Sequence, residues 1–232
     1  MADPTPYGDL TLAEFNERLA SAEPVPGGGS ASAVAGSLAA SLVTMVAELS
    51  KRPRYMEHSA LHGKVEADGR ELAARLLRLA DEDAASYTAF GAALKLPRET
   101  DAERETRGAA IRAAARVASE IPMRCVETCL EVTLAAESLA GRCNQNASSD
   151  LTVATLLAEA AAKGAAANVR VNLPSVEDDG WADAMEAKVA GILEEIATTG
   201  NSCRSIVASG GLRGPLPVIP PRAGLATHGP VG

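Results

Sequence analysis

The chain has 232 residues and a net charge of −8, and its hydrophobic fraction of 47% contrasts with an aromatic fraction of only 3%. Alanine supplies 47 of the residues. Because alanine favours helices whereas strands favour β-branched and aromatic residues, this composition excludes a β-sandwich or barrel. The acidic charge excludes nucleic acid and an anionic membrane as expected partners, since both need a concentrated basic surface. We therefore expect one all-α domain that acts on a small molecule or on another protein.

The N-terminal segment predicts a short helix and no export signal. The first twenty residues contain four carboxylates and lack a basic start followed by an apolar core, so we expect a cytoplasmic protein. Apolar residues at helical spacing predict a helix that begins near Asp9 or Thr11 and ends before Pro24.

The next segment, residues 25–47, is a run of 23 uncharged residues. Its length is sufficient to cross a bilayer, but serines and threonines interrupt an alanine-rich run of modest hydrophobicity. A helix without charge on any face is typical of the buried centre of a bundle. We expect it to be capped by Ser30 and to end near Ser50, before Pro53.

Helical periodicity continues along the rest of the chain, and Pro122 predicts a kink or a break in one of the segments. The pattern predicts helices at residues 57–94, 100–140, 149–169 and 175–206. We therefore expect a bundle of about six helices around a buried alanine-rich helix in a domain of residues 1–208. Residues 209–232 form a tail whose glycine and proline content does not support a packed core.

The glycines Gly27, Gly28 and Gly29, followed by Ser30, stand directly before the uncharged helix. Glycines let backbone N–H groups approach a ligand, and a helix N-terminus favours negative charge. The segment lacks the GK[ST] of a P-loop, and no strand precedes it, so nucleotide binding is not expected. From spacing alone, contact of these glycines with a ligand and a purely structural role in a tight turn and close helix packing are equally supported.

Small polar residues gather between the predicted helices at 100–140 and 149–169. By pattern alone they cap and terminate helices, although they are also suited to ordering a substrate or a water molecule. The residues between the two helices are Asn144, Asn146, Ser148, Ser149 and Asp150. Asn168 and Asn172 flank the end of the second helix, where asparagine is also a common terminator.

Three other groups of residues are candidate sites by residue type. Asp83 and Tyr87 share a helix face beside Asp81 and Glu82, and by pattern alone they belong to a solvated acidic surface. His58 and His62 also share a face, but they lack the glutamate of an HExxH motif, so no metal site is expected. The four cysteines are too sparse for a disulfide scaffold and are interpreted as buried small side chains.

Four segments in this order resemble the cyclodeaminase/cyclohydrolase family of folate enzymes. They are PVPGGGSASAVAGSLAASLVTMVAELS, DEDAASYTAF with LKLP after it, NQNASSDLTVATLLAEAA and GAAANVRVNL, within residues 10–173. The family includes methenyltetrahydrofolate cyclohydrolases and the C-terminal domain of formiminotransferase-cyclodeaminase. The resemblance implies an all-helical homodimer that uses neither a metal nor a nucleotide cofactor and takes a tetrahydrofolate derivative as its substrate.

The resemblance also implies site residues. It favours Asp83 or Asp150 as the catalytic carboxylate, with Asn146 or Tyr87 holding the water and the pterin, and Lys51 or Arg52 facing the glutamate tail. The remaining implied binding residues are Gly27, Gly28, Gly29, Ser30, Tyr55, Ser149, Asn168 and Asn172.

The expected reaction is hydrolysis of 5,10-methenyltetrahydrofolate to 10-formyltetrahydrofolate. One alternative is cyclodeamination of 5-formiminotetrahydrofolate with release of ammonia, which passes through a similar tetrahedral carbon between N5 and N10. A second alternative is a helical binding or assembly module without catalysis.

Overall fold

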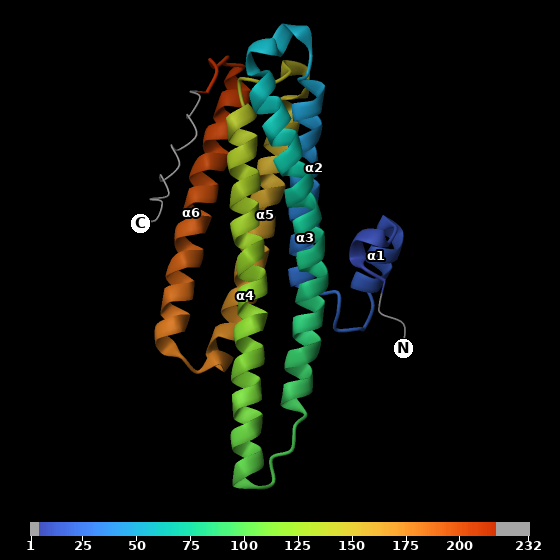
Figure 1. Ribbon diagram of the computed structural model, residues 1–232, viewed down its shortest axis with the longest axis vertical. Helices are drawn as coiled ribbons and strands as arrows, with labels where there is room; N and C mark the ends of the chain where they lie inside the picture. Colours follow the sequence, from blue (N-terminus) through green and yellow to red (C-terminus); the bar gives the residue numbers. More distant parts are fainter. Residues whose placement is uncertain (1–4, 217–232) are drawn as a thin grey trace, which may run out of the picture.

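The computed structural model describes residues 5–216, which contain six α-helices, four short 3-10 helices and no strand (Figure 1). The prediction of an all-α bundle of about six helices is therefore confirmed for this part of the chain. The α-helices are α1 (Leu12–Leu19), α2 (Gly28–Leu49), α3 (Ser59–Leu94), α4 (Asp101–Leu139), α5 (Ser149–Asn172) and α6 (Asp179–Ser209). The 3-10 helices are η1 (Tyr7–Asp9), η2 (Pro53–His58), η3 (Gln145–Ala147) and η4 (Leu173–Val176).

Helix α2 is the central element, as the uncharged run predicts. It packs against α3, α4 and α5, and its alanines Ala33, Ala39, Ala40 and Ala47 are at most 1% exposed. By length and hydropathy α2 is also able to cross a membrane, but 61% of its most apolar window is buried within the bundle. Its small side chains let the neighbouring helices approach closely, which explains a core rich in alanine.

Helix α2 starts differently from the prediction. It begins at Gly28, and its N-cap is Gly27 rather than Ser30. Ser30 lies inside the first turn, where its hydroxyl is placed to donate to the Ala80 carbonyl at 3.0 Å. The capping prediction was wrong because a tertiary contact to α3 uses the Ser30 hydroxyl that the sequence pattern assigned to the local backbone.

The single helix predicted at residues 100–140 is present without a break at Pro122, whereas the helix predicted at residues 149–169 ends later than expected. Helix α4 continues through the buried Pro122 from Asp101 to Leu139, so the proline does not divide it. Helix α5 extends to Asn172, three residues past the predicted end. This extension matters for the site because it places Asn168 and Asn172 on the last turns of one continuous helix.

The helices form an elongated bundle in which α3 and α4 make a long hairpin that projects past the other helices (Figure 1). Helix α6 packs on α4 and α5. The short α1 lies beside α3, outside the main bundle (Figure 1). It is tied there through η1, where the Tyr7 backbone N–H donates to Asp81 at 2.8 Å and the Tyr7 ring packs edge-on against Phe15.

Of the predicted tail, the structure describes residues up to 216, and residues 217–232 lie outside the described range. The described part runs along the end of α4. The Arg213 backbone N–H donates to the Gly141 carbonyl at 2.9 Å, and the Arg142 side chain donates to the Gly214 carbonyl at 2.7 Å.

Candidate functional site

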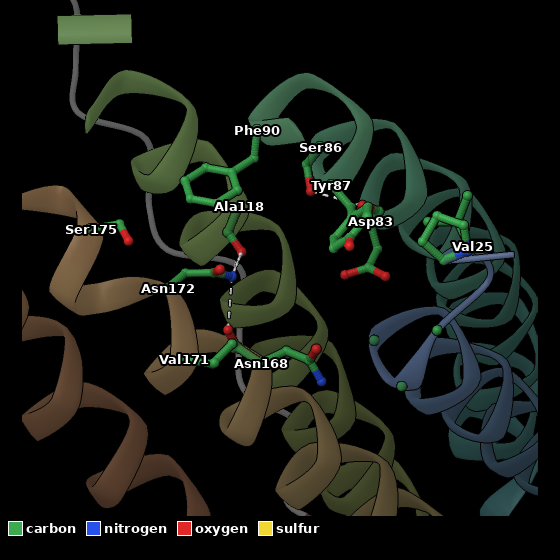
Figure 2. Close-up of a pocket in the computed structure, with 14 residues that line it drawn as sticks. Val25, Asp83, Ser86, Tyr87, Phe90, Ala118, Asn168, Val171, Asn172 and Ser175 are labelled. Carbon is green, nitrogen blue, oxygen red and sulfur yellow. Dashed lines mark hydrogen bonds between the residues drawn. The ribbon is translucent and has the colours of Figure 1, made fainter. Parts of the chain in front are cut away.

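A cavity of about 370 Å³ opens between the N-terminus of α2, the C-terminal third of α3 and the C-terminal turns of α5 (Figure 2). Its volume lies within the range of small-molecule sites. Three sequence motifs that are far apart in the chain thus meet at one place. The lining residues are Pro24, Val25, Gly27, Gly28, Gly29, Asp83, Ser86, Tyr87, Phe90, Ala118, Asn168, Val171, Asn172 and Ser175.

Among the residues of 5–216 that line the cavity, Asp83 is the only one with a formal charge. Its carboxylate lies against the first turn of α2, where the Ser30 hydroxyl is 3.1 Å from Oδ2 and 3.0 Å from the Ala80 carbonyl, so its single proton is shared between these two acceptors. Burial raises the pKa of the Asp83 carboxyl above its usual 3.8, and hydrogen bonds from the Ser30 side chain and backbone act in the opposite direction. A carboxylate with a raised pKa is better matched to general-base catalysis near neutral pH than an ordinary aspartate.

The close approach of Asp83 to α2 requires the glycine at position 29. A Cβ built on Gly29 would lie 2.5 Å from Asp83 Cγ and 2.6 Å from Oδ2, well inside van der Waals contact. Equivalent atoms on Gly27 and Gly28 would make ordinary contacts at 3.5 Å and 3.7 Å. Of the three glycines, Gly29 is therefore the one that makes room for the carboxylate.

Asn168 and Asn172 lie on the wall that α5 contributes, across the cavity from Asp83 (Figure 2). The Asn172 amide donates to the carbonyls of Ala118 and Asn168 at 2.8 Å and 2.9 Å, and the Asn168 amide donates to the Gly164 carbonyl at 2.9 Å. Both amide groups are thereby held in place. Within residues 5–216 neither carboxamide oxygen receives a hydrogen bond, so both oxygens are available as acceptors for a ligand.

Tyr87 and Phe90 add aromatic surface to the cavity. Both come from α3, on the face that carries Asp83 and the buried Ser86. Of these lining residues, the sequence pattern predicted Tyr87 as a site residue but not Phe90, Ser86 or Val25. The spacing of Asp83, Ser86, Tyr87 and Phe90 is that of one helix face, which is the signal that could have found two of them.

The other predicted site residues lie at the opposite end of α2. Asn144 anchors this second cluster, because its backbone N–H donates to the Ser50 hydroxyl at 2.8 Å and its side chain accepts from the Tyr55 hydroxyl at 3.4 Å. Lys51 is paired with Glu48 and Glu66. The cluster contains Lys51, Arg52, Tyr55, Asn146, Ser149 and Asp150, with Asn146 and Ser149 exposed.

The two clusters are separated by the 22 residues of α2, or about 33 Å at the rise of an α-helix. A folate monoglutamate is too short to contact both ends within one chain. The roles assigned to Lys51, Arg52, Asn146 and Asp150 stay predictions, and in a single chain these residues do not join the cavity that contains Asp83.

His58 and His62 form a buried pair near the second cluster. The rings of His58 and His62 are 6.1 Å apart, and His62 Nε2 is 2.9 Å from the Arg142 carbonyl. Burial lowers the pKa of His62, which is consistent with a neutral ring that donates from Nε2. No group of three or more metal-ligating side chains occurs in residues 5–216. The cysteines in the structure, Cys125, Cys129, Cys143 and Cys203, are free thiols and buried.

Comparison with known proteins identifies relatives over most of the chain. Residues 11–191 match the family model described as Formiminotransferase-cyclodeaminase. Methenyltetrahydrofolate cyclohydrolase of Methylorubrum extorquens is 35% identical over 189 residues, which cover 81% of this chain and 91% of the relative. Formimidoyltransferase-cyclodeaminase of Rattus norvegicus is 30% identical over 191 residues, but this chain spans only 35% of its length.

The fold also matches a solved structure. Formiminotetrahydrofolate cyclodeaminase from Thermotoga maritima superimposes with a TM-score of 0.79 at 24% identity, covering 87% of this chain and 98% of that one. At this identity the match establishes a shared fold. Together with the family model and the 35% identical relative, it leads to one conclusion: the chain belongs to the formiminotransferase-cyclodeaminase family.

Proposed function

We propose that this protein hydrolyses 5,10-methenyltetrahydrofolate to 10-formyltetrahydrofolate in the cavity that contains Asp83. The observation that carries the proposal is that Asp83 supplies the only formal charge on the cavity wall within the described part of the chain. The substrate presents a delocalised cation at the carbon between N5 and N10, so its charge is opposite to that of the site. The 35% identical relative, a methenyltetrahydrofolate cyclohydrolase, supports the same reaction.

The carboxylate of Asp83 serves two steps. It stabilises the cationic head while the substrate binds, and it then accepts a proton from the water that forms a bond to the bridging carbon. The resulting tetrahedral adduct collapses when the bond from carbon to N5 breaks, N5 gains a proton and the formyl group stays on N10. One proton is released overall. A positioned general base contributes about 10² to 10⁴ in rate.

The other groups on the wall orient the head of the substrate. The carboxamide oxygens of Asn168 and Asn172 match the N–H groups of a pterin ring, and Tyr87 and Phe90 offer aromatic surface for stacking. The reaction needs only water, a base and a held substrate, so we propose that no cofactor takes part.

Cyclodeamination of 5-formiminotetrahydrofolate is the second candidate, favoured by the family and by the rat relative. In that reaction N10 attacks the formimino carbon and ammonia leaves, and the same carboxylate would handle the protons. A non-catalytic module is disfavoured by the cavity itself, because packing alone does not require two fixed amides to face a half-buried carboxylate across an open space.

We also propose that the protein is a homodimer. Several large apolar side chains are exposed on the adjoining helices α2 and α5, among them Leu38 (53%), Met45 (38%), Val153 (46%) and Leu156 (52%). A group of exposed apolar side chains on neighbouring helices is typical of a subunit interface.

The test follows the absorbance of 5,10-methenyltetrahydrofolate at slightly acidic pH, where the uncatalysed reaction is slow, beside an assay with the formimino substrate. We expect loss of the methenyl compound with wild-type protein. Asp83→Asn should reduce the rate by about 10² to 10⁴ without lowering the melting temperature, because asparagine can still accept the hydrogen bond from Ser30. Asp150→Asn is the matched comparison at the far end of α2.

The outcomes separate the candidates. Loss of activity only in the Asp150 variant would place the chemistry at the second cluster and contradict the assignment to this cavity. Formation of the methenyl compound from the formimino substrate, without its hydrolysis, would identify a cyclodeaminase. If neither substrate reacts, the enzymatic proposal is wrong.

A further inference from the structure

A second cavity of about 370 Å³ lies beside the first, between α3, α1 and the segment that precedes α1. Val25 lines both cavities, so the Pro24-Val25-Pro26 loop forms a wall common to the two. The second cavity is mostly apolar, with polar groups at a few positions. It is lined by Thr5, Pro6, Tyr7, Arg18, Val25, Pro26, Asp81, Ala84, Ala85 and Thr88.

Two opposite charges face this second cavity from different helices. Arg18 comes from the last turn of α1, and within residues 5–216 it forms no ion pair or hydrogen bond through its side chain. Asp81 comes from α3, and its Oδ1 accepts the Tyr7 backbone N–H at 2.8 Å, while Oδ2 has no donor in the described part of the chain. The cavity thus offers one cation and one acceptor oxygen beside an apolar wall.

Charged groups from both cavities affect the pKa of the Tyr7 hydroxyl. The pKa of the Tyr7 hydroxyl is raised, first by partial burial and then by the negative charge of Asp81, while Arg18 lowers it. Asp83 of the first cavity raises the pKa further. Val25 lines both cavities, so an elongated ligand that passes this residue meets the Asp83 carboxylate at one end and the Arg18 guanidinium at the other.

A folate substrate has this distribution of charge. The methenyl head is a cation, whereas the tail is an aminobenzoyl ring joined through an amide to the two carboxylates of glutamate. Such a tail needs an apolar wall for the ring, an acceptor for the amide N–H and a cation for a carboxylate. Arginine is well suited to the last role because its planar guanidinium binds carboxylates through two hydrogen bonds.

We infer that the second cavity binds the acylglutamate tail of the substrate, with Arg18 pairing with a glutamate carboxylate and Asp81 accepting the amide N–H. The inference rests on the proposed function, since it names the folate whose head occupies the first cavity. It assigns the tail to α1 instead of Lys51 or Arg52, which lie at the far end of α2. Helix α1, which contributes little to the core, then has a role in binding.

The test compares Arg18→Gln and Arg18→Lys with Arg98→Gln, an exposed arginine in the α3–α4 turn that lines neither cavity. Each protein is assayed with 5,10-methenyltetrahydrofolate and with its diamide, in which neutral carboxamides replace both glutamate carboxylates. We expect Arg18→Gln to raise KM for the natural substrate about tenfold. A tenfold change corresponds to the low end of the free energies measured for hydrogen bonds to charged groups, as suits an exposed site. We expect kcat and the KM for the diamide to be unchanged, and lysine to restore part of the affinity.

A binding experiment separates this inference from the proposed function. N-(4-aminobenzoyl)-glutamate, the isolated tail, is titrated calorimetrically into wild-type protein and into the Arg18→Gln and Arg98→Gln variants. Weaker binding only in the Arg18 variant supports the tail site, even if the wild-type protein turns over no folate. Equal binding to all three proteins, or an equal rise in KM for both substrates, overturns the inference.

Discussion

Replacing Gly29 with alanine tests whether the position of the Asp83 carboxylate, rather than its mere presence, determines activity. The added Cβ would lie 2.5 Å from Asp83 Cγ, whereas carbon atoms in contact are normally separated by about 3.5 Å or more. The carboxylate must therefore move by about 1 Å. It lies at the end of a short side chain that can rotate, so the backbone of α3 need not shift.

The expected result is a large loss of activity with little loss of stability. A displacement of about 1 Å in a catalytic group costs on the order of 10²-fold in rate. Alanine is favoured over glycine in a helix by about 1 kcal/mol in the interior and by less in the first turn, which offsets part of the strain. The assay is kcat for 5,10-methenyltetrahydrofolate hydrolysis, measured beside the melting temperature.

Gly28→Ala is the matched control because it makes the same chemical change one residue earlier. Its Cβ would lie 3.7 Å from the Asn168 side chain, an ordinary contact, so we expect nearly wild-type kcat. If the Gly29 and Gly28 variants had the same activity, Asp83 would not act from the position that the structure gives it, and the argument for a placed general base would be refuted.

Three further predictions concern stability and assembly. Gly69→Ala would push a Cβ into the Thr44 hydroxyl at the contact between α3 and α2 and should destabilise the fold by about 1–3 kcal/mol in urea unfolding. Gly63→Ala on the same helix meets nothing within 4 Å and should stabilise it by up to about 1 kcal/mol; equal effects would contradict the packing argument. Burial lowers the pKa of His62 below 6.5 in the folded protein, so the stability that comes from its neutral ring is present above pH 6.5 and is lost as the pH falls below that value. The melting temperature should therefore fall less between pH 7.5 and pH 5 in His62→Gln than in wild type, and identical slopes would show that this histidine does not titrate on unfolding. Leu38→Lys should convert the proposed dimer to a monomer in sedimentation, whereas an unchanged mass would exclude the α2 face as the interface.

The helices were predictable because their signals are local. Thr11 and Thr100 cap α1 and α4 by accepting from the backbone N–H groups of Glu14 and Glu103, three residues further on, so both helices begin close to the predicted positions. The N-cap of α2 was mispredicted for the opposite reason. Ser30 hydrogen-bonds with residues about fifty positions away on α3, and no local pattern contains that information.

The grouping of the site residues was beyond the sequence pattern. By spacing alone, Asp83 belongs to an acidic surface and Asn168 terminates a helix, and neither pattern shows that the two face one cavity. Nor does any local pattern show that Asp150 lies a full helix length from Asp83. Distances between helices depend on packing, which a periodicity within one helix does not determine.

The raised pKa of Asp83 bears on the choice between the two reactions of the family. Hydrolysis needs the ionised carboxylate, because the attacking water must lose a proton. Cyclodeamination also needs an acid, because ammonia leaves only after the amino group on the tetrahedral carbon is protonated, and a buried carboxyl that retains its proton to higher pH is a better donor near neutrality. One residue with a shifted pKa thus suits both chemistries, in different protonation states. On the proposed assignment to Asp83, the same cavity suits either reaction, so discrimination comes from the groups that hold the leaving amine or the water rather than from Asp83 itself.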